Sequence, residues 1–219
     1  MTKERIKQIA AGGAIAAAAL VLFLELRAPT PPFQAEPHQA LGQVAAEEAL
    51  KLTPGQGRVV VFARDQKTFK SPAAAAQLAG FADALAKAGR KIAATNLLAV
   101  DPLRIASVPP GGFLERLQRG AEGDVIVSFL GPPLLTDDQL RRLGQKRVPV
   151  VAVCSGDLPR QVDLRRLFEQ KLLHAAIITR LAPLPKPPPG AAPRSCFDSL
   201  FQVILPGNLD DLPAYKGPS

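Results

Sequence analysis

The hydrophobic pattern of the chain centres on one apolar run, from Val125 to Leu130. Glycine and proline bound this run on both sides, at Gly123 and at residues 131–133. A strand that is buried on both faces has this pattern, because neither face presents side chains to water. Such strands lie in the middle of parallel sheets. We therefore expect residues 125–130 to contain the central strand of an α/β layer.

Around this run, from residue 58 to residue 181, short apolar stretches alternate with amphipathic ones. The apolar stretches at 58–63, 91–100, 148–153 and 175–179 are expected to be further strands. The amphipathic stretches carry helix-end signals. Ser71 before Pro72 starts one helix and Gly89 ends it, while Thr136 and Gln139 have the capping-box spacing. A longer helix is expected over residues 163–173.

Helices that alternate with apolar strands predict right-handed crossovers and a parallel sheet. We predict an α/β fold with a single open, mainly parallel sheet of strand order 2-1-3-4-5 and helices on both faces. The apolar pattern resumes at residues 196–205, after a proline-rich stretch, which predicts a sixth strand or a helix–strand unit that returns to the sheet.

The first 28 residues have the pattern of a membrane-targeting segment. Lys3, Arg5 and Lys7 precede an apolar run from Ile9 to Leu24. The residues that follow form a poor cleavage site, which favours an uncleaved signal-anchor helix over a cleaved signal peptide. The positive residues place the amino terminus in the cytoplasm and the remainder of the chain outside it, on the periplasmic side of a bacterial inner membrane.

The remaining chain divides by composition. Residues 29–57 are expected to be a proline-rich spacer followed by a helix, over 38–52, that docks on the next domain. Residues 58–181 are expected to form a flavodoxin-like α/β domain. Residues 182–219 are expected to hold a proline-rich arm, a C-terminal strand and a tail.

The segments Arg58–Arg64, Gly123–Ser128 and Val148–Val153, with the helix that ends at Gly89, give the chain a fold-level similarity to a known family. Over about residues 58–181 it resembles one lobe of the type I periplasmic solute-binding proteins, which are related in shape to flavodoxin-like domains. The motifs are generic for α/β sheets. Such proteins close two lobes on a ligand, so a resemblance to one lobe implies a single-lobe ligand-binding or sensory module rather than a transport protein.

Composition narrows the binding chemistry. The formal net charge is +8, but the basic residues are dispersed among 19 carboxylates, so nucleic acid is not an expected partner. The chain has no Trp and one Tyr, so aromatic stacking is not an expected means of ligand binding. No glycine-rich phosphate motif follows the first strand, and no cofactor is expected.

Ligands of open parallel sheets bind at the carboxyl ends of the strands, beside the point where the strand order reverses. In the predicted order this crevice lies between the first and third strands. The candidate ligand-binding residues there are Arg64, Asp65, Gln66, Lys67, Gly131 and Ser155. Arg64 and Lys67 are suited to an anionic group, which Asp65 would orient. A solvated polar loop is the alternative interpretation.

Cys154 and Ser155 follow the fourth strand, where a nucleophile would be accessible. A nucleophile needs a base, and the histidines are His38, outside the sheet unit, and His174, at the amino end of the fifth strand. A hydrolase built on Cys154 or Ser155 is therefore the least supported function, and no catalytic residue or metal site is assigned. Outside the cytoplasm Cys154 and Cys196 are free to pair, so we predict a disulfide, with two buried free thiols as the alternative.

Two main functions remain open. The first is a membrane-anchored, extracytoplasmic accessory or structural subunit that binds other protein subunits without catalysis. The second is the single-lobe module that binds a small ligand.

Overall fold

The computed structural model describes residues 18, 20, 23, 33–55, 57–67, 70–99, 108, 110–188 and 190–217. The chain divides into two compact units, Met1–Phe33 and Gln34–Ser219. The predicted signal-anchor falls almost entirely outside the described residues. Within the residues that the structure describes, no helix has the length and apolar character needed to cross a membrane. All elements named below belong to the second unit.

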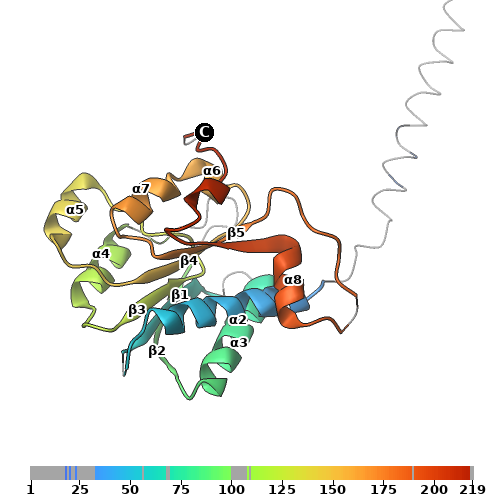
Figure 1. Ribbon diagram of the computed structural model, residues 1–219, viewed down its shortest axis with the longest axis horizontal. Coiled ribbons are helices and arrows are strands. Elements are labelled where there is room, and N and C mark those ends of the chain that lie inside the picture. Colours follow the sequence, from blue (N-terminus) through green and yellow to red (C-terminus); the bar gives the residue numbers. More distant parts are fainter. Residues whose placement is uncertain are drawn as a thin grey trace, which may run out of the picture. The chain divides into compact units, whose positions relative to one another are not determined.

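The second unit is built on a six-stranded sheet (Figure 1). Its strands are β1 (Val59–Arg64), β2 (Ile92–Leu98), β3 (Val125–Ser128), β4 (Val150–Cys154), β5 (Ala175–Thr179) and β6 (Phe201–Ile204). The spatial order is β2-β1-β3-β4-β5-β6. All neighbours are parallel except β5 and β6, which are antiparallel. The predicted mainly parallel α/β sheet and its strand order are therefore confirmed.

Helices cover both faces of this sheet (Figure 1). One face carries α2 (Glu36–Lys51), α3 (Pro72–Lys87) and α8 (Pro193–Leu200). The other carries α4 (Pro110–Arg119), α5 (Asp137–Leu143), α6 (Leu158–Gln161) and α7 (Leu164–Glu169). A short 3-10 helix, η1 (Leu209–Asp211), follows β6.

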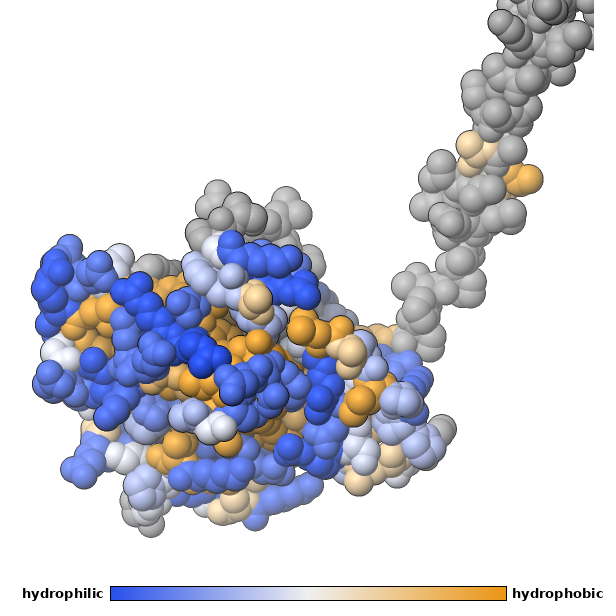
Figure 2. All heavy atoms as spheres, turned by 45° about the horizontal axis from the view of Figure 1, so that its top comes forward, coloured by the Kyte–Doolittle hydropathy of each residue, from blue (hydrophilic) through white to orange (hydrophobic). Residues whose placement is uncertain are grey.

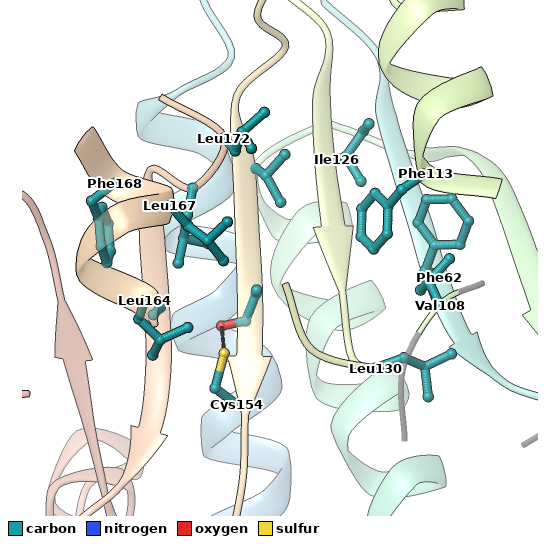
Figure 3. Close-up of a cluster of buried hydrophobic side chains, with 14 of the residues drawn as sticks. Phe62, Val108, Phe113, Ile126, Leu130, Cys154, Leu164, Leu167, Phe168 and Leu172 are labelled. Atoms are coloured by element: carbon teal, nitrogen blue, oxygen red, sulfur yellow. Dashed lines mark hydrogen bonds between the residues drawn. The ribbon is translucent and has the colours of Figure 1, made fainter. Parts of the chain in front are cut away.

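Two hydrophobic cores lie on the two faces of the sheet, because successive strand residues point to opposite sides. In β3, Ile126 joins the core under α4 to α7, whereas Val125 and Val127 join the core under α2 and α3. All four residues of β3 and all five of β4 are buried. The apolar run from which the fold was predicted is therefore buried on both faces, and Figure 3 shows one of the two cores.

The helix ends follow their sequence signals. The Ser71 hydroxyl accepts a hydrogen bond from Ala74 N at 3.3 Å, and Gly89 takes a φ of +69° two residues after α3 ends. Both bonds of the Thr136–Gln139 capping box are formed at the start of α5. These terminal N–H groups have no partner within the helix, so the caps stabilise the first turn.

The fourth crossover helix is shorter than predicted. It was expected over 163–173, but α7 ends at Glu169. Leu172 N and Leu173 N both donate back to Leu167 O, and Lys171 takes a φ of +55°. The apolar residues at the end of the predicted helix thus turn into the core, where Leu172 and Leu173 are each 1% exposed.

The helix that precedes the sheet packs on it. In the described part of the chain, α3 is the one helix between two parallel strands that packs on this face of the sheet. Helix α2 lies beside α3 and contacts β3, β4 and β5. Leu41, Val44 and Ala45 of α2 are at most 2% exposed. Without α2, the apolar side chains of β3 to β5 on this face would be open to water.

The predicted disulfide is not formed, since Cys154 and Cys196 are both free thiols. Cys154 ends β4 and belongs to the core under α4 to α7 (Figure 3). Cys196 lies on α8 and packs against the core on the other face. The sheet therefore separates the two sulfur atoms, and a bridge would require one of the two side chains to cross it.

Candidate functional site

A pocket of about 350 Å³ opens at the carboxyl edge of the sheet. We call it the carboxyl-edge pocket. Its polar lining comprises His38, Arg64, Gln66, Ser71, Gln77, Ser155 and Thr179, and its apolar lining includes Leu78, Phe129, Leu130 and Phe201. The lining comes from the ends of β1, β3, β4 and β5, the start of β6, and helices α2 and α3. Parallel strands bring these ends together because their carboxyl ends share one edge.

Three of the residues predicted from the sequence, Arg64, Gln66 and Ser155, line this pocket. Asp65 and Lys67 do not line it, because they close the turn after β1, where the Asp65 carboxylate accepts a hydrogen bond from Lys67 N at 2.9 Å. Gly131 does not line the pocket either; it is buried and has a φ of +86°. The wall next to β3 is therefore formed by Phe129 and Leu130.

Hydrogen bonds within the loops hold the polar side chains in place. Gln66 Oε1 accepts from Ser71 N at 2.8 Å, which ties the loop after β1 to the start of α3. Thr179 Oγ1 accepts from Gly156 N at 3.2 Å, which ties the loop after β4 to the end of β5. A hydroxyl that accepts one bond still has its own O–H to donate. Thr179 is therefore positioned and retains a donor.

The charge of the pocket comes from Arg64. Among its described lining residues Arg64 is the only permanently charged side chain, and no carboxylate is present. Arg64 is half-buried at the end of β1. A guanidinium presents several N–H donors in one plane, so it binds carboxylates and also oxygen acceptors of neutral ligands.

Sequence reasoning missed His38, Thr179 and Phe201. His38 was placed outside the sheet unit, but α2 packs on the sheet and brings it to the pocket. Its ring lies 6.2 Å from that of Phe201, centroid to centroid, and burial lowers the pKa of His38. Phe201 arrives because β6 runs antiparallel and begins at the edge where β5 ends. The docking helix and the sixth strand were both expected, but their positions on the sheet were not.

The structure does not assemble a nucleophile from Cys154. Its side chain is fully buried, and burial raises the pKa of the thiol, so the reactive thiolate is disfavoured. His174 lies at the opposite end of the strands, where its Nδ1 accepts from Val150 N at 3.3 Å, at the start of β4. In the part of the chain that the structure describes, no three His, Cys, Asp or Glu side chains gather as metal ligands would.

Comparisons with known proteins show similarity at the level of the fold. No protein-family model matches the chain, and neither does any curated protein. Among solved structures it is similar to an ABC transporter solute-binding protein from Agrobacterium vitis with bound D-fucose, with 14% identity and a TM-score of 0.52 over 79% of this chain and 59% of that one. An arabinose-binding protein from Geobacillus stearothermophilus gives 13% identity and a TM-score of 0.52 over 81% of this chain and 63% of that one.

A substrate-binding protein of a sugar ABC transport system from Bordetella parapertussis gives 13% identity and a TM-score of 0.50, over 80% of this chain and 58% of that one. The chain thus spans between 58% and 63% of the length of these three structures. At this level of identity the likeness concerns the fold. The predicted fold-level resemblance to one lobe of the type I periplasmic binding proteins is confirmed.

Proposed function

We propose that this chain is a single-lobe module that binds a small polar ligand of monosaccharide size in the carboxyl-edge pocket. The observation that carries the proposal is the pocket itself, where hydrogen-bonding side chains from separate loops meet at the edge of the sheet. Ligands of open α/β sheets bind at this edge. The solved structures of similar fold that carry the names of bound sugars are consistent with this ligand class.

The size and chemistry of the pocket support this ligand class. A volume of about 350 Å³ lies near the lower end of the range of small-molecule sites. Arg64, Gln66, Ser155 and Thr179 provide donors and acceptors for hydroxyl groups, and Phe129 and Phe201 provide apolar surface for the C–H face of a ring. Because a guanidinium can bind a carboxylate through two parallel N–H groups, we expect a sugar acid to bind more tightly than the neutral sugar.

The test is a thermal-shift titration of the full chain in mild detergent with pentoses, hexoses, 6-deoxyhexoses and the corresponding uronic acids. A ligand at a hundred times its dissociation constant stabilises the folded state by about 2.7 kcal/mol, which for a chain of this length raises Tm by about 5 °C or more. A panel in which no compound raises Tm would contradict the proposal.

Variants locate the site. Arg64→Ala and Ser155→Ala are expected to weaken binding of the active compound by about tenfold or more, the loss of one charged or polar contact. Arg142→Ala removes an equally basic, exposed side chain on α5, away from the pocket, and is the matched control. If Arg142→Ala weakens binding as much as Arg64→Ala, the ligand binds elsewhere.

We further propose that residues 1–28 anchor the chain in a membrane and that Gln34–Ser219 lies outside the cytoplasm. The supporting pattern is the basic cluster Lys3, Arg5 and Lys7 before the apolar run. Membrane fractionation and a C-terminal alkaline phosphatase fusion, which is active only outside the cytoplasm, test this arrangement. Association with other protein subunits stays a prediction, and copurification from native membranes tests it.

A further inference from the structure

A second pocket, of about 360 Å³, opens at the amino edge of the sheet, and we call it the amino-edge pocket. Arg58, Asp124 and Val148, which come shortly before β1, β3 and β4, line it together with the last turn of α4. Arg58 and Arg64 lie at opposite ends of β1, about 20 Å apart at about 3.3 Å per residue. The amino-edge pocket is therefore separate from the carboxyl-edge pocket.

Two alanines of β2 leave room in this pocket. Val59 pairs with Ile92 and Val60 with Ala94, so Ala93 is an extra residue at which the register shifts. Ala93 and Ala94 both line the pocket, and Ala94 lies beside Val60, which packs against the core under α4 to α7. A larger side chain at Ala94 would occupy the volume that is open here.

Arg116 of α4 is held in the pocket by a neutral group. Its Nη2 donates to Asn96 Oδ1 at 2.7 Å, and Asn96 Nδ2 in turn donates to Val61 O at 3.2 Å. The amide is thus fixed on both sides and positions the half-buried guanidinium. In the described part of the chain, no carboxylate lies within ion-pair distance of Arg116. Because an amide has no net charge, the positive charge of Arg116 is not neutralised.

Arg58 is fixed at the pocket by the buried carboxylate of Asp124. Its Nε lies 3.2 Å from both carboxylate oxygens, and its Nη2 lies 2.7 Å from Oδ2. The Nη1 group makes no hydrogen bond to the residues that the structure describes. A guanidinium has five N–H donors, so Arg58 retains donors for a ligand.

The third guanidinium, that of Arg119, is paired only at the surface. Its Nη2 lies 2.9 Å from Glu115 Oε1, one helical turn away, and the two side chains are 69% and 55% exposed. Exposed ion pairs of this kind contribute little to stability. Arg119 can therefore leave Glu115 and bind another anion at low cost.

The lining of the pocket is positive. Its charged side chains are three arginines and Asp124, so three positive charges and one negative charge leave +2. The carbonyl end of α4 adds about half a negative charge, which offsets only part of this excess. The rest of the lining is apolar and includes Val60, Ile126 and Val148.

We propose that the amino-edge pocket binds the phosphate group of a small molecule, with Arg116 and Arg119 as the main contacts and Arg58 as a further donor. A phosphate monoester carries a charge of about −1.5 to −2 at pH 7 and three acceptor oxygens, which matches several guanidiniums. A single carboxylate would leave more of the positive charge unbalanced. The apolar lining provides a surface for the carbon part of an organic phosphate.

Calorimetric titration of the full chain, in mild detergent and a phosphate-free buffer of low ionic strength, tests the ligand class. Glycerol 3-phosphate is expected to bind several-fold more tightly than inorganic phosphate, because it also contacts the apolar lining. Equal or tighter binding of inorganic phosphate would still support a phosphate site and identify free phosphate as its source. Absence of binding by both compounds, or malonate binding as tightly as glycerol 3-phosphate, overturns the proposal.

Three variants locate the site. Arg116→Ala and Arg119→Ala each remove one guanidinium, and Ala94→Leu fills the pocket while it keeps every arginine. Each is expected to weaken binding of glycerol 3-phosphate by about tenfold or more. Arg58 is left unchanged because its loss would leave the buried Asp124 unpaired. Arg142→Ala, on α5, is the matched control and is expected to bind as the wild type does.

The Tm of each variant without ligand shows whether it folds, and Arg119→Ala, at an exposed position, tests the site even if Arg116→Ala is unstable. Wild-type affinity in folded Arg119→Ala and Ala94→Leu chains overturns the proposal. Binding that is lost in Arg64→Ala and kept in these variants also overturns it, because the phosphate would then lie in the carboxyl-edge pocket. The outcome does not depend on the sugar titrations, so the two proposals are tested separately.

Discussion

At the residue scale, Asp124 is a buried carboxylate held by an ion pair and by main-chain hydrogen bonds. Its side chain is 4% exposed and pairs with Arg58, whose Nη2 lies 2.7 Å from Oδ2. Asp124 also accepts from Arg58 N at 2.9 Å and from Ala121 N at 2.8 Å. The hydrogen bond from the Arg58 side chain is the main reason that the pKa of Asp124 is lowered to about 2. The carboxylate thereby ties the start of β1 to the start of β3.

A lowered pKa predicts a pH dependence of stability. Because Asp124 is ionised more readily in the folded state, it stabilises the fold at pH values above the ordinary pKa of 3.8, by about 2 kcal/mol, and this contribution is lost as the pH falls toward 2. Urea unfolding of Asp124→Asn at pH 7 is expected to show the loss directly.

The Asp124→Asn chain is also expected to lose less stability than the wild type between pH 5 and pH 2. Asp83→Asn, an exposed carboxylate on α3, is the control and is expected to follow the wild type. Parallel pH curves for Asp124→Asn and wild type would show that the ion pair does not contribute.

The two cysteines are expected to differ in reactivity. Cys154 is fully buried with its pKa raised by burial, whereas Cys196 is half-exposed on α8. A thiol reagent is expected to modify one thiol in the native protein and two after denaturation, and mass mapping should place the native label on Cys196. Modification of Cys154 in the native protein, or a change of mobility on reduction, would contradict the placement of the thiols on opposite faces.

At the element scale, the contact between α2 and α3 is made backbone to backbone. A Cβ atom placed on Gly42 would lie 2.0 Å from Gln77 O, and one placed on Gly80 would lie 2.2 Å from Gln39 O. Glycine normally weakens a helix relative to alanine, so its use at both positions reflects the crossing and not the helices themselves. Figure 1 shows α2 crossing beside α3 on one face of the sheet.

Gly42→Ala and Gly80→Ala are therefore expected to destabilise the protein, although alanine is the better helix former by about 1 kcal/mol. The overlap is with main-chain oxygen and is relieved only if the helices move apart, a cost of about 1–3 kcal/mol. Gly111→Ala in α4, where nothing lies within 4 Å of the added Cβ, is the control and is expected to be neutral or stabilising. Chemical denaturation measures all three, and equal effects would refute the close crossing.

Element boundaries were best predicted where a cap marks them. Ser71, Gly89 and the Thr136–Gln139 box act over a few neighbouring residues, so local sequence determined those ends. The end of α7 was predicted wrongly because Leu172 and Leu173 continue the helical spacing of apolar residues. In the structure they belong to the turn after α7 and are buried from there. The spacing of apolar residues predicts that they are buried, but it does not determine whether a helix or a turn carries them into the core.

At the scale of the whole molecule, the sheet is completed by a helix that comes before its first strand. The helix α2 lies with α3 and α8 on one face, and the unit Gln34–Ser219 is compact as a whole. The visible face in Figure 2 is mostly hydrophilic with scattered hydrophobic patches, and the large exposed apolar residues of this unit include Leu97, Leu181 and Leu184. The core under α2, α3 and α8 is thus covered only when α2 is docked.

Because α2 is part of the core, it is expected to unfold with the sheet. Native-state hydrogen exchange should give the amides of α2, such as those of Leu41 and Val44, the same opening free energy as amides of β3. Helix α5, which is short and largely exposed, is the internal comparison and is expected to exchange through smaller openings. Exchange of α2 at a much lower free energy than β3 would mean that α2 is a detachable appendage.

The local sequence by itself determined the layer type, the order of elements and the edge of the sheet at which the candidate pocket lies. Continuous burial of Val125–Val127 requires a strand covered on both faces, and alternation with helices requires parallel pairing. Arg64 and Ser155 end up at the same pocket because they follow parallel strands, whatever else surrounds them.

Only the tertiary structure decided what meets across the sheet and across long sequence separations. His38 and Phe201 reach the pocket because of where α2 and the antiparallel β6 dock, and such packing depends on the complementarity of whole surfaces. Cys154 and Cys196 are kept apart because the Cys154 side chain points to one face of the sheet, whereas α8, which carries Cys196, packs on the other face. The pattern of apolar residues predicts which side chains are buried. Which other side chains they contact depends on how the elements pack in the folded protein.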